Sequence, residues 1–207
     1  MTRPALLAVA FSPRAAMRRL LDRGPSRRRE IMALVLAAFL SSVAKDVRTV
    51  ELDQPAVWLV PVTIALSALA AVGVFYLFAW GAAFAGRLVD GTGTAAQIRT
   101  ALAWGFAPLI LALLYRLPMM FLAPRKVVFR AADFTASTPP LLIVGVLDLL
   151  VLVWYLIVGG ITLSEAQGVS SWAGLGNLLL AWILPFVSIG AVVLAAVLTP
   201  YFNPSAT

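Results

Sequence analysis

The sequence contains no cysteine and no histidine among its 207 residues. Without these side chains the chain cannot form disulfides, thiolate nucleophiles, histidine-ligated haem or the usual zinc sites. Charge is also scarce, because charged residues make up 12% of the chain, against roughly 25% in an ordinary soluble domain. A hydrophobic content of 62%, arranged in long uncharged runs, is typical of an integral membrane protein.

The apolar residues form five windows along the chain. They are 31–44, 56–86, 100–122, 139–163 and 172–201. At a rise of about 1.5 Å per residue, the last four are long enough to cross a hydrocarbon core of about 30 Å. The first has only fourteen residues, and it spans if the basic residues at its two ends reach the interfaces.

Basic residues predict the orientation. Eight arginines lie in the first thirty residues, at positions 3, 14, 18, 19, 23, 27, 28 and 29, and basic flanks stay in the cytoplasm. With five spans, Arg87 and Arg99 join them, which gives ten basic residues inside and five outside (positions 45, 48, 125, 126 and 130). With four spans, the count is thirteen inside and two outside. Charge alone therefore favours four spans.

Three segments carry a resemblance to a known family. They read "FSPRAAMRRLLDRGPSRR", "FAGRLVDGTGTAAQIRTALAWGFAPLIL" and "LLVLVWYLIVGGITLSEAQGVSSWAGLGNLLLAWILP". These segments resemble the Yip family, and specifically its bacterial branch. The family consists of membrane proteins first known as partners of Ypt/Rab GTPases. The shared features are small-residue helix ends, a Gly-containing turn, a polar helix start, an aromatic residue followed by Pro, and the "SEAQG" turn. The positions that fill this pattern are Gly86, Gly93, Gln97, Gly105, Phe106, Pro108, Trp154, Gly160 and Pro185.

The resemblance implies an all-α fold, a bundle of five transmembrane helices in the bacterial inner membrane with the amino terminus in the cytoplasm. We therefore expect a basic amphipathic segment at 1–30, the membrane domain at 31–201 and a short tail at 202–207. The chain has Gly105-Phe106 where eukaryotic members show Gly-Tyr, and it lacks their long soluble amino-terminal region. Rab binding is therefore not carried over.

The stretch 87–100, "RLVDGTGTAAQIRT", looks at first like a phosphate-binding loop. A P-loop needs a preceding strand and a Lys, and this stretch has neither. Thr94 and Gln97 instead have the spacing of a capping box that starts a helix. Gly91 and Gly93 supply the backbone freedom for a turn between two membrane helices.

Arg116 and Asp148 are the two charges placed furthest inside apolar windows, and such residues are functional candidates. Both lie at a similar depth from the same loop, about 9 Å and about 13 Å at the helical rise. An ion pair between the two helices is the simplest interpretation. An Arg that snorkels alone and a proton or ion pathway are the alternatives.

Residues 12–24, "SPRAAMRRLLDRG", have helix punctuation at both ends, with Ser12 as N-cap, Pro13 at the first position and Gly24 past the last. Met17 and the two leucines after it share one face, and arginines surround them. This pattern predicts a basic amphipathic helix on an anionic leaflet. The arginines expected to contact lipid headgroups are Arg14, Arg18, Arg19 and Arg23. Nucleic acid is not the expected partner.

No catalytic constellation can be assembled from this sequence. Serine proteolysis and metalloproteolysis in the membrane need His, and aspartyl proteolysis needs two opposed carboxylates. We therefore expect a protein without enzymatic activity, metal or cofactor. Two functions are compatible with the pattern: an adaptor or organiser that contacts lipid and another membrane protein, or a small transporter or channel.

Overall fold

The computed structural model describes residues 4–24, 26, 28–46, 59–122 and 139–184. Within these ranges all regular structure is helical, which confirms the all-α class. The helices are α1 (Ala5–Phe11), α2 (Pro13–Asp22), α3 (Arg28–Asp46), α4 (Leu59–Arg87), α5 (Ala95–Gly105), α6 (Ala107–Leu111), α7 (Leu113–Leu122) and α8 (Pro139–Gln167), followed by an apolar helix at Ser171–Leu184.

Three of the helical segments are long and apolar enough to cross a membrane. They are Ile64–Arg87, Ala95–Pro118 and Ile143–Gln167, counted over the described residues. The protein is thus a polytopic helical membrane protein, but the count of five spans is not confirmed. The first window forms α3. The fifth window, 172–201, is described only as far as Leu184, where the helix that begins at Ser171 ends. The tail at 202–207 lies outside them.

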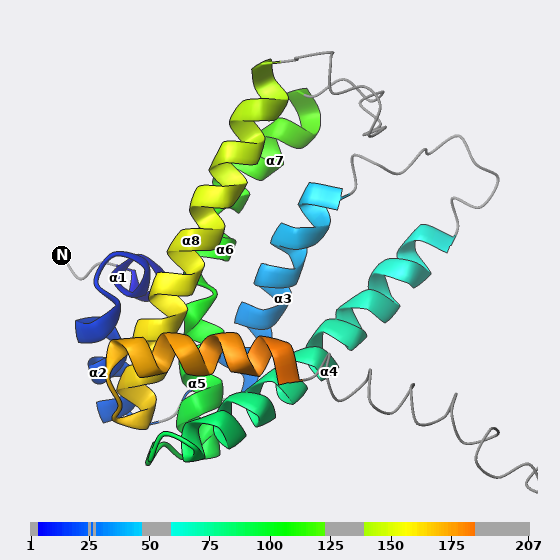
Figure 1. Cartoon of the computed structure of the whole chain (residues 1–207). Coiled ribbons are helices and arrows are strands. Elements are labelled where there is room, and N and C mark those ends of the chain that lie inside the picture. The colour runs from blue at the N-terminus through cyan, green and yellow to red at the C-terminus, as the bar shows by residue number, and fades with distance from the viewer. Residues whose placement is uncertain (1–3, 25, 27, 47–58, 123–138, 185–207) are drawn as a thin grey trace, which may run out of the picture.

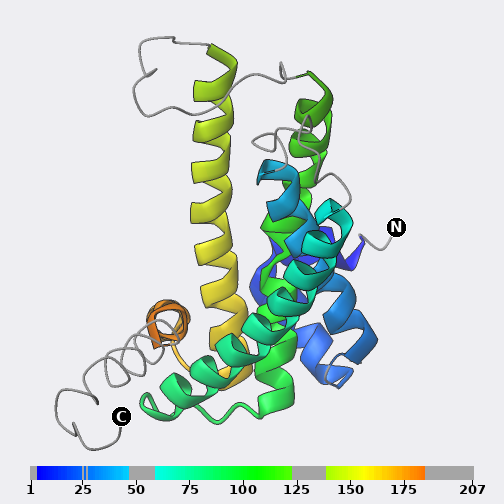
Figure 2. The same cartoon turned by 90° about the vertical axis from the view of Figure 1, so that its right-hand side faces the viewer.

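Figures 1 and 2 show α3, the α5–α7 series and α8 rising together, with α4 inclined away from α3. The helix Ser171–Leu184 runs across the lower end of α8 instead of along it (Figures 1 and 2). The short helices α1 and α2 pack beside that same end, where α2 contacts α8. Most of the packing is therefore concentrated in the lower half of the molecule.

The third apolar window is one path broken into three helices. Helix α5 ends at Gly105, α6 begins with Pro108 in its first turn, and α7 follows after Ala112. A proline has no N–H to donate to the preceding turn, so a break at this point is expected. The backbone bond from Arg116 N to Ala112 O, at 3.0 Å, then continues the path into α7.

The largest apolar core joins α3, α4, α5, α8 and the helix Ser171–Leu184. Its buried members include Val35, Phe75, Leu102, Leu163 and Leu178. A second core joins α1 to α6 and α8 through Val9, Ala107 and Val158. The amino-terminal segment is therefore part of the packed molecule.

Helix α1 was not expected from the sequence as an element of its own. Its seven residues, "ALLAVAF", are too few to show a helical period, and the sequence pattern predicts one basic amphipathic segment over 1–30. In the structure Val9 and Ala10 are buried, and the indole N–H of Trp154 donates to the Ala10 carbonyl at 3.0 Å. Contacts from a helix far along the chain thus hold α1 in place.

Candidate functional site

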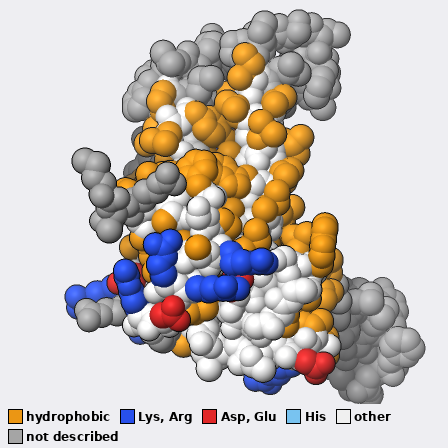
Figure 3. Space-filling model, turned by 90° about the vertical axis from the view of Figure 1, so that its left-hand side faces the viewer, with side chains coloured by type: hydrophobic (Ala, Val, Ile, Leu, Met, Phe, Trp, Pro, Cys, Tyr) orange, Lys and Arg blue, Asp and Glu red, His pale blue; other side chains and the backbone are white. Residues whose placement is uncertain are grey.

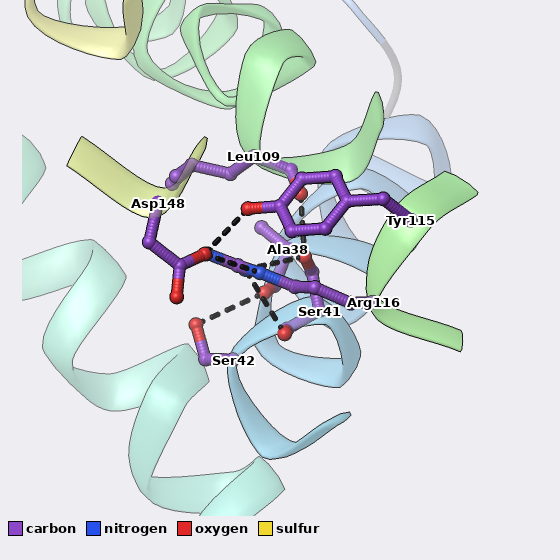
Figure 4. A network of polar contacts seen from close by, with 7 residues as sticks. All are labelled: Ala38, Ser41, Ser42, Leu109, Tyr115, Arg116 and Asp148. Atoms are coloured by element: carbon purple, nitrogen blue, oxygen red, sulfur yellow. Dashed lines mark hydrogen bonds and ion pairs between the residues drawn. The ribbon is translucent and has the colours of Figure 1, made fainter. Parts of the chain in front are cut away.

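The structure brings Arg116 on α7 and Asp148 on α8 together (Figure 4). The Arg116 Nη2 atom lies 2.7 Å from Asp148 Oδ1, and Nε lies 3.1 Å from the same oxygen. Both side chains are largely buried, with 8% and 18% of their surfaces exposed. This geometry matches the ion pair expected from their similar depths. It also leaves no lone, snorkelling arginine at this position.

Two further residues complete this polar cluster. Arg116 Nη1 donates to the Ser41 carbonyl at 3.0 Å and to its hydroxyl at 2.8 Å, and that hydroxyl donates to the Leu109 carbonyl. The Tyr115 hydroxyl donates to Asp148 Oδ1 (Figure 4). The cluster therefore connects α3, α6, α7 and α8. Sequence reasoning missed Ser41 and Tyr115, although Ser41 is one of two polar residues inside an apolar window.

A second polar assembly lies at the lower end of the molecule, where the loop 88–94 meets the end of α8. The capping box is present: Gln97 N donates to Thr94 Oγ1 at 3.3 Å, and Thr94 N donates to Gln97 Oε1 at 2.8 Å. In addition, Thr92 N donates to the carbonyl of Gln167, the last residue of α8, at 2.9 Å. The loop thus starts one helix and satisfies the end of another.

The two loop glycines do not provide the conformational freedom that the sequence suggested. Among the described residues, positive φ occurs at Gly24, Gly168 and Asp90, and not at Gly91 or Gly93. Space is the reason for glycine here. A Cβ on Gly93 would lie 2.4 Å from the Ala166 carbonyl oxygen, and one on Gly91 would lie 2.9 Å from the Gly86 carbonyl oxygen. Close backbone packing between the loop and its neighbours therefore requires both glycines.

Gln167 continues this assembly into the interior. Its amide nitrogen donates to the Ala82 carbonyl at 3.0 Å, and its amide oxygen accepts from Asn177 Nδ2 at 2.5 Å. Both amides are buried. Helix α4, helix α8 and the helix Ser171–Leu184 are thus joined by one chain of hydrogen bonds.

The third assembly involves the arginines of α2. Arg14 Nε lies 2.8 Å and Arg18 Nε lies 2.6 Å from the carboxylate of Glu165 on α8. This hydrogen-bonded carboxylate raises the pKa of Arg18 above its usual value. Arg19 Nε donates to the Ala15 carbonyl of its own helix, and Arg23 is exposed. Basic side chains gather below the mainly hydrophobic part of the surface in Figure 3.

The apolar face of α2 packs against the protein, whereas the sequence predicted that it lies in a leaflet. Met17 is fully buried and packs with Ala101 of α5 and Ala166 of α8. That face is therefore occupied by the protein, and only the arginine face points outward. The Gly24 stop is present with φ +91°, whereas Ser12 holds the N-cap position without a side-chain capping bond.

Comparison with known protein families gives one match. The Yip1 domain matches residues 7–194, which is most of the chain. The chain belongs to the Yip1 family. No curated protein and no solved structure matches it. All three polar assemblies lie within the matched segment.

Yip1 proteins are a family of membrane proteins that is not known for enzymatic activity. In this Yip1 chain, the described residues contain no group of three metal-ligating side chains. The three polar assemblies have one property in common. Each one fixes the position of one helix against another through charge or amide hydrogen bonds.

Proposed function

We propose that this Yip1-family protein is a non-enzymatic adaptor or organiser, acting in the bacterial inner membrane through contacts with lipid and with another membrane protein. One observation carries the choice over a transporter. The ion pair within the described apolar helices is engaged in holding α3, α7 and α8 together, so its charges serve packing. A transport site needs polar groups that a solute can reach in alternation.

The cavities support the same choice. The apolar cavity between α3, α4 and the helix Ser171–Leu184 has a volume of about 340 Å³, and a single polar side chain, Ser42, lines it. Neither Arg116 nor Asp148 lines this cavity. A solute in this cavity would thus not contact the buried ion pair.

The basic band of α2 supports contact with anionic lipid. Glu165 neutralises part of the charge of Arg14 and Arg18, so Arg19 and Arg23 are the arginines best placed to face headgroups. Cationic residues near an anionic leaflet contribute about 1 kcal/mol each. We expect Arg19→Gln/Arg23→Gln to weaken flotation with phosphatidylglycerol vesicles, and Arg87→Gln, at the exposed end of α4, to serve as the control.

The orientation is part of the proposal: residues 1–30 in the cytoplasm, five spans, and Thr207, which lies outside the described residues, on the opposite side. The lengthwise packing of α3 against α5, α6 and α7 favours five spans over a surface position for the first window. Alkaline phosphatase fused after Thr207 should be active. An inactive fusion, together with a bright fluorescent protein at the same position, would indicate four spans.

The adaptor function is tested by reconstitution and by crosslinking in native membranes. Liposomes that contain the protein should show no flux beyond empty liposomes for protons, ions or a broad solute panel. Photocrosslinkers on the exposed face of α2 should capture one membrane protein in a fixed ratio. A flux that Asp148→Asn abolishes would overturn the adaptor proposal and make Asp148 a transport residue.

A further inference from the structure

Two neighbouring cavities on the α3–α4 side of the molecule differ in chemistry. The polar one has a volume of about 320 Å³ and is lined by Ser26, Arg28, Ile31, Tyr76, Ala96 and Arg99. The apolar one, of about 340 Å³, is lined by residues such as Val35, Phe39, Val74 and Phe78. A basic cavity beside an apolar one suits a ligand with an anionic end and a hydrocarbon end.

The two cavities follow the same helices. On α3, lining residues recur at Arg28, Ile31, Val35 and Ala38, which is one face of a helix at three- and four-residue spacing. On α4, Phe75 lines the apolar cavity and its neighbour Tyr76 lines the polar one. The two cavities therefore occupy successive turns of α3 and meet the same stretch of α4 on neighbouring faces.

The polar cavity has donors that lack an anionic partner. Within the part of the chain that the structure describes, neither Arg28 nor Arg99 forms a salt bridge, and no carboxylate lines the cavity. The Arg99 guanidinium lies 5.9 Å from the ring centroid of Tyr76, and its Nε donates to the Ala95 carbonyl. The terminal nitrogens of Arg99 and the whole guanidinium of Arg28 thus remain to bind a ligand.

Ser26 adds an oriented hydroxyl. Its oxygen accepts a hydrogen bond from the Trp104 indole at 3.0 Å, and its backbone N–H donates to the Thr100 hydroxyl at 3.0 Å. A hydroxyl that accepts through its oxygen still has its own hydrogen to donate. Two guanidinium groups and a fixed hydroxyl are the donor set that phosphate recognition uses.

We propose that this side of the molecule binds one anionic phospholipid, with its phosphate between Arg28 and Arg99 and one acyl chain in the apolar cavity. The site deepens the lipid contacts of the proposed function and rests on them, but it is distinct from the α2 arginines. The apolar cavity is the reason to choose a lipid over a soluble phosphate, because a free anion makes no use of it.

The first test measures lipid binding to the full chain. Native mass spectrometry in mild detergent, with phosphatidylglycerol added in steps, should show one adduct that is tighter than the rest. Arg28→Gln/Arg99→Gln should weaken that adduct about tenfold or more, because each arginine loses charge-assisted hydrogen bonds. Arg29→Gln/Arg87→Gln removes the same net charge at exposed positions outside the cavity and should leave the adduct unchanged. Equal losses in both double variants would mean non-specific attraction and overturn the site.

The second test addresses the acyl chain. Ala71 lines the apolar cavity, so Ala71→Phe should fill space that a long acyl chain would occupy. Binding of dioleoyl phosphatidylglycerol should weaken several-fold, and binding of the dihexanoyl lipid should not change. Leu69→Phe, on the exposed surface of the same helix, is the matched control. If inorganic phosphate and the short-chain lipid bind the unchanged protein as tightly as the long-chain lipid, the site is one for soluble anions and the proposal is wrong.

A third measurement, the quenching of tryptophan fluorescence, leaves the residues of the basic cavity unsubstituted. Trp182 lines the apolar cavity, so brominated acyl chains bound there should quench its fluorescence. Brominated phosphatidylglycerol should quench more than brominated phosphatidylcholine at equal mole fraction, and Trp182→Phe should remove the difference. Equal quenching by the two lipids would contradict a charge-selective site. Failure of these lipid tests would leave the flux and crosslinking tests of the adaptor function unaffected.

Discussion

The two halves of α8 belong to one apolar span, Ile143–Gln167, but pack very differently. From Ile143 to Val153 most side chains are exposed, including Leu149 and Leu150 at 59% each. From Trp154 to Gln167 most are buried. The outer half, 143–153, is held by the ion pair of Asp148. The inner half, 154–167, packs closely against α2, α5 and the helix Ser171–Leu184.

Small and polar residues account for the difference. The inner half contains Gly159, Gly160 and Thr162, and a Cβ added to Gly105 of α5 would lie 3.2 Å from the Gly159 Cα. In lipid, large apolar side chains gain little by leaving one apolar environment for another, so close approach and hydrogen bonding drive helix association. Hydropathy therefore identifies α8 as a span but does not indicate where it packs.

The largest expected effect comes from removing the anchor of the outer half. Arg116→Ala and Asp148→Ala should each reduce thermal stability in lipid nanodiscs by about 1 to 4 kcal/mol, because each leaves a buried charge without its partner. The double change should cost much less than the sum of the two. Arg87→Ala, at an exposed helix end, is the control. Additive losses would show that the two charges are not coupled.

The inner half can be tested by adding a single methyl group. Gly174→Ala places a Cβ 2.4 Å from the Gly160 carbonyl oxygen and 2.6 Å from Ser164 Cβ. Overpacking of this kind costs about 1 to 3 kcal/mol. Gly176, two residues along, has no neighbour within 4 Å of such a Cβ, so Gly176→Ala should be neutral or stabilising. Equal melting temperatures for the two variants would contradict close packing at Gly174.

The loop that supports the end of α8 should show a smaller effect. Thr94→Ala removes the side-chain acceptor of the capping box and should cost about 1 kcal/mol. Hydrogen exchange at the start of α5 should increase, and Thr94→Ser should restore protection. Unchanged exchange in the Ala variant would mean that the Thr92 and Gly93 contacts with α8 are sufficient to hold the loop.

The smallest effect is expected at the exposed ion pairs of the inner half. Glu165→Gln removes the partner of Arg14 and Arg18, whose side chains are 57% and 65% exposed. Protease cleavage within α2 should increase slightly at low salt, and the difference should vanish near 1 M salt, where screening acts over about 3 Å. The loss caused by Asp148→Ala should persist at that salt concentration, because the Arg116 pair is buried.

Much of the fold could be predicted because it depends on local pattern. Uncharged windows indicated the apolar helices, Thr94 and Gln97 indicated a helix start, and the depths of Arg116 and Asp148 placed them within reach of each other. The break after Gly105 agrees with the position of Pro108. These features need only spacing along one segment, so a single sequence contains the information.

The remaining features depend on which helices meet. Nothing local distinguishes Ser41, which binds Arg116, from Ser42, whose hydroxyl bonds to its own helix at Ala38. The burial of Met17 against α5 and α8 was likewise invisible, because an apolar helix face fits a leaflet and a protein surface equally well. The sequence indicates that glycine is needed at 91 and 93, but it does not show the reason. For Gly93 the reason is the Ala166 carbonyl, which lies more than seventy residues further along the chain.

The contacts of Gln167 also have a consequence for the order of synthesis. The groups that satisfy it from α4 and the following loop, the Ala82 carbonyl and the Thr92 N–H, precede α8 in the chain. They leave the ribosome first, so both partners have been synthesised before the end of α8 emerges. Asn177 comes last and occupies the one remaining acceptor, the amide oxygen of Gln167. A released chain that ends at Gly168 would therefore keep the partners of Gln167 from α4 and the loop, and would lack Asn177 together with the helix that packs against Gly159 and Gly160.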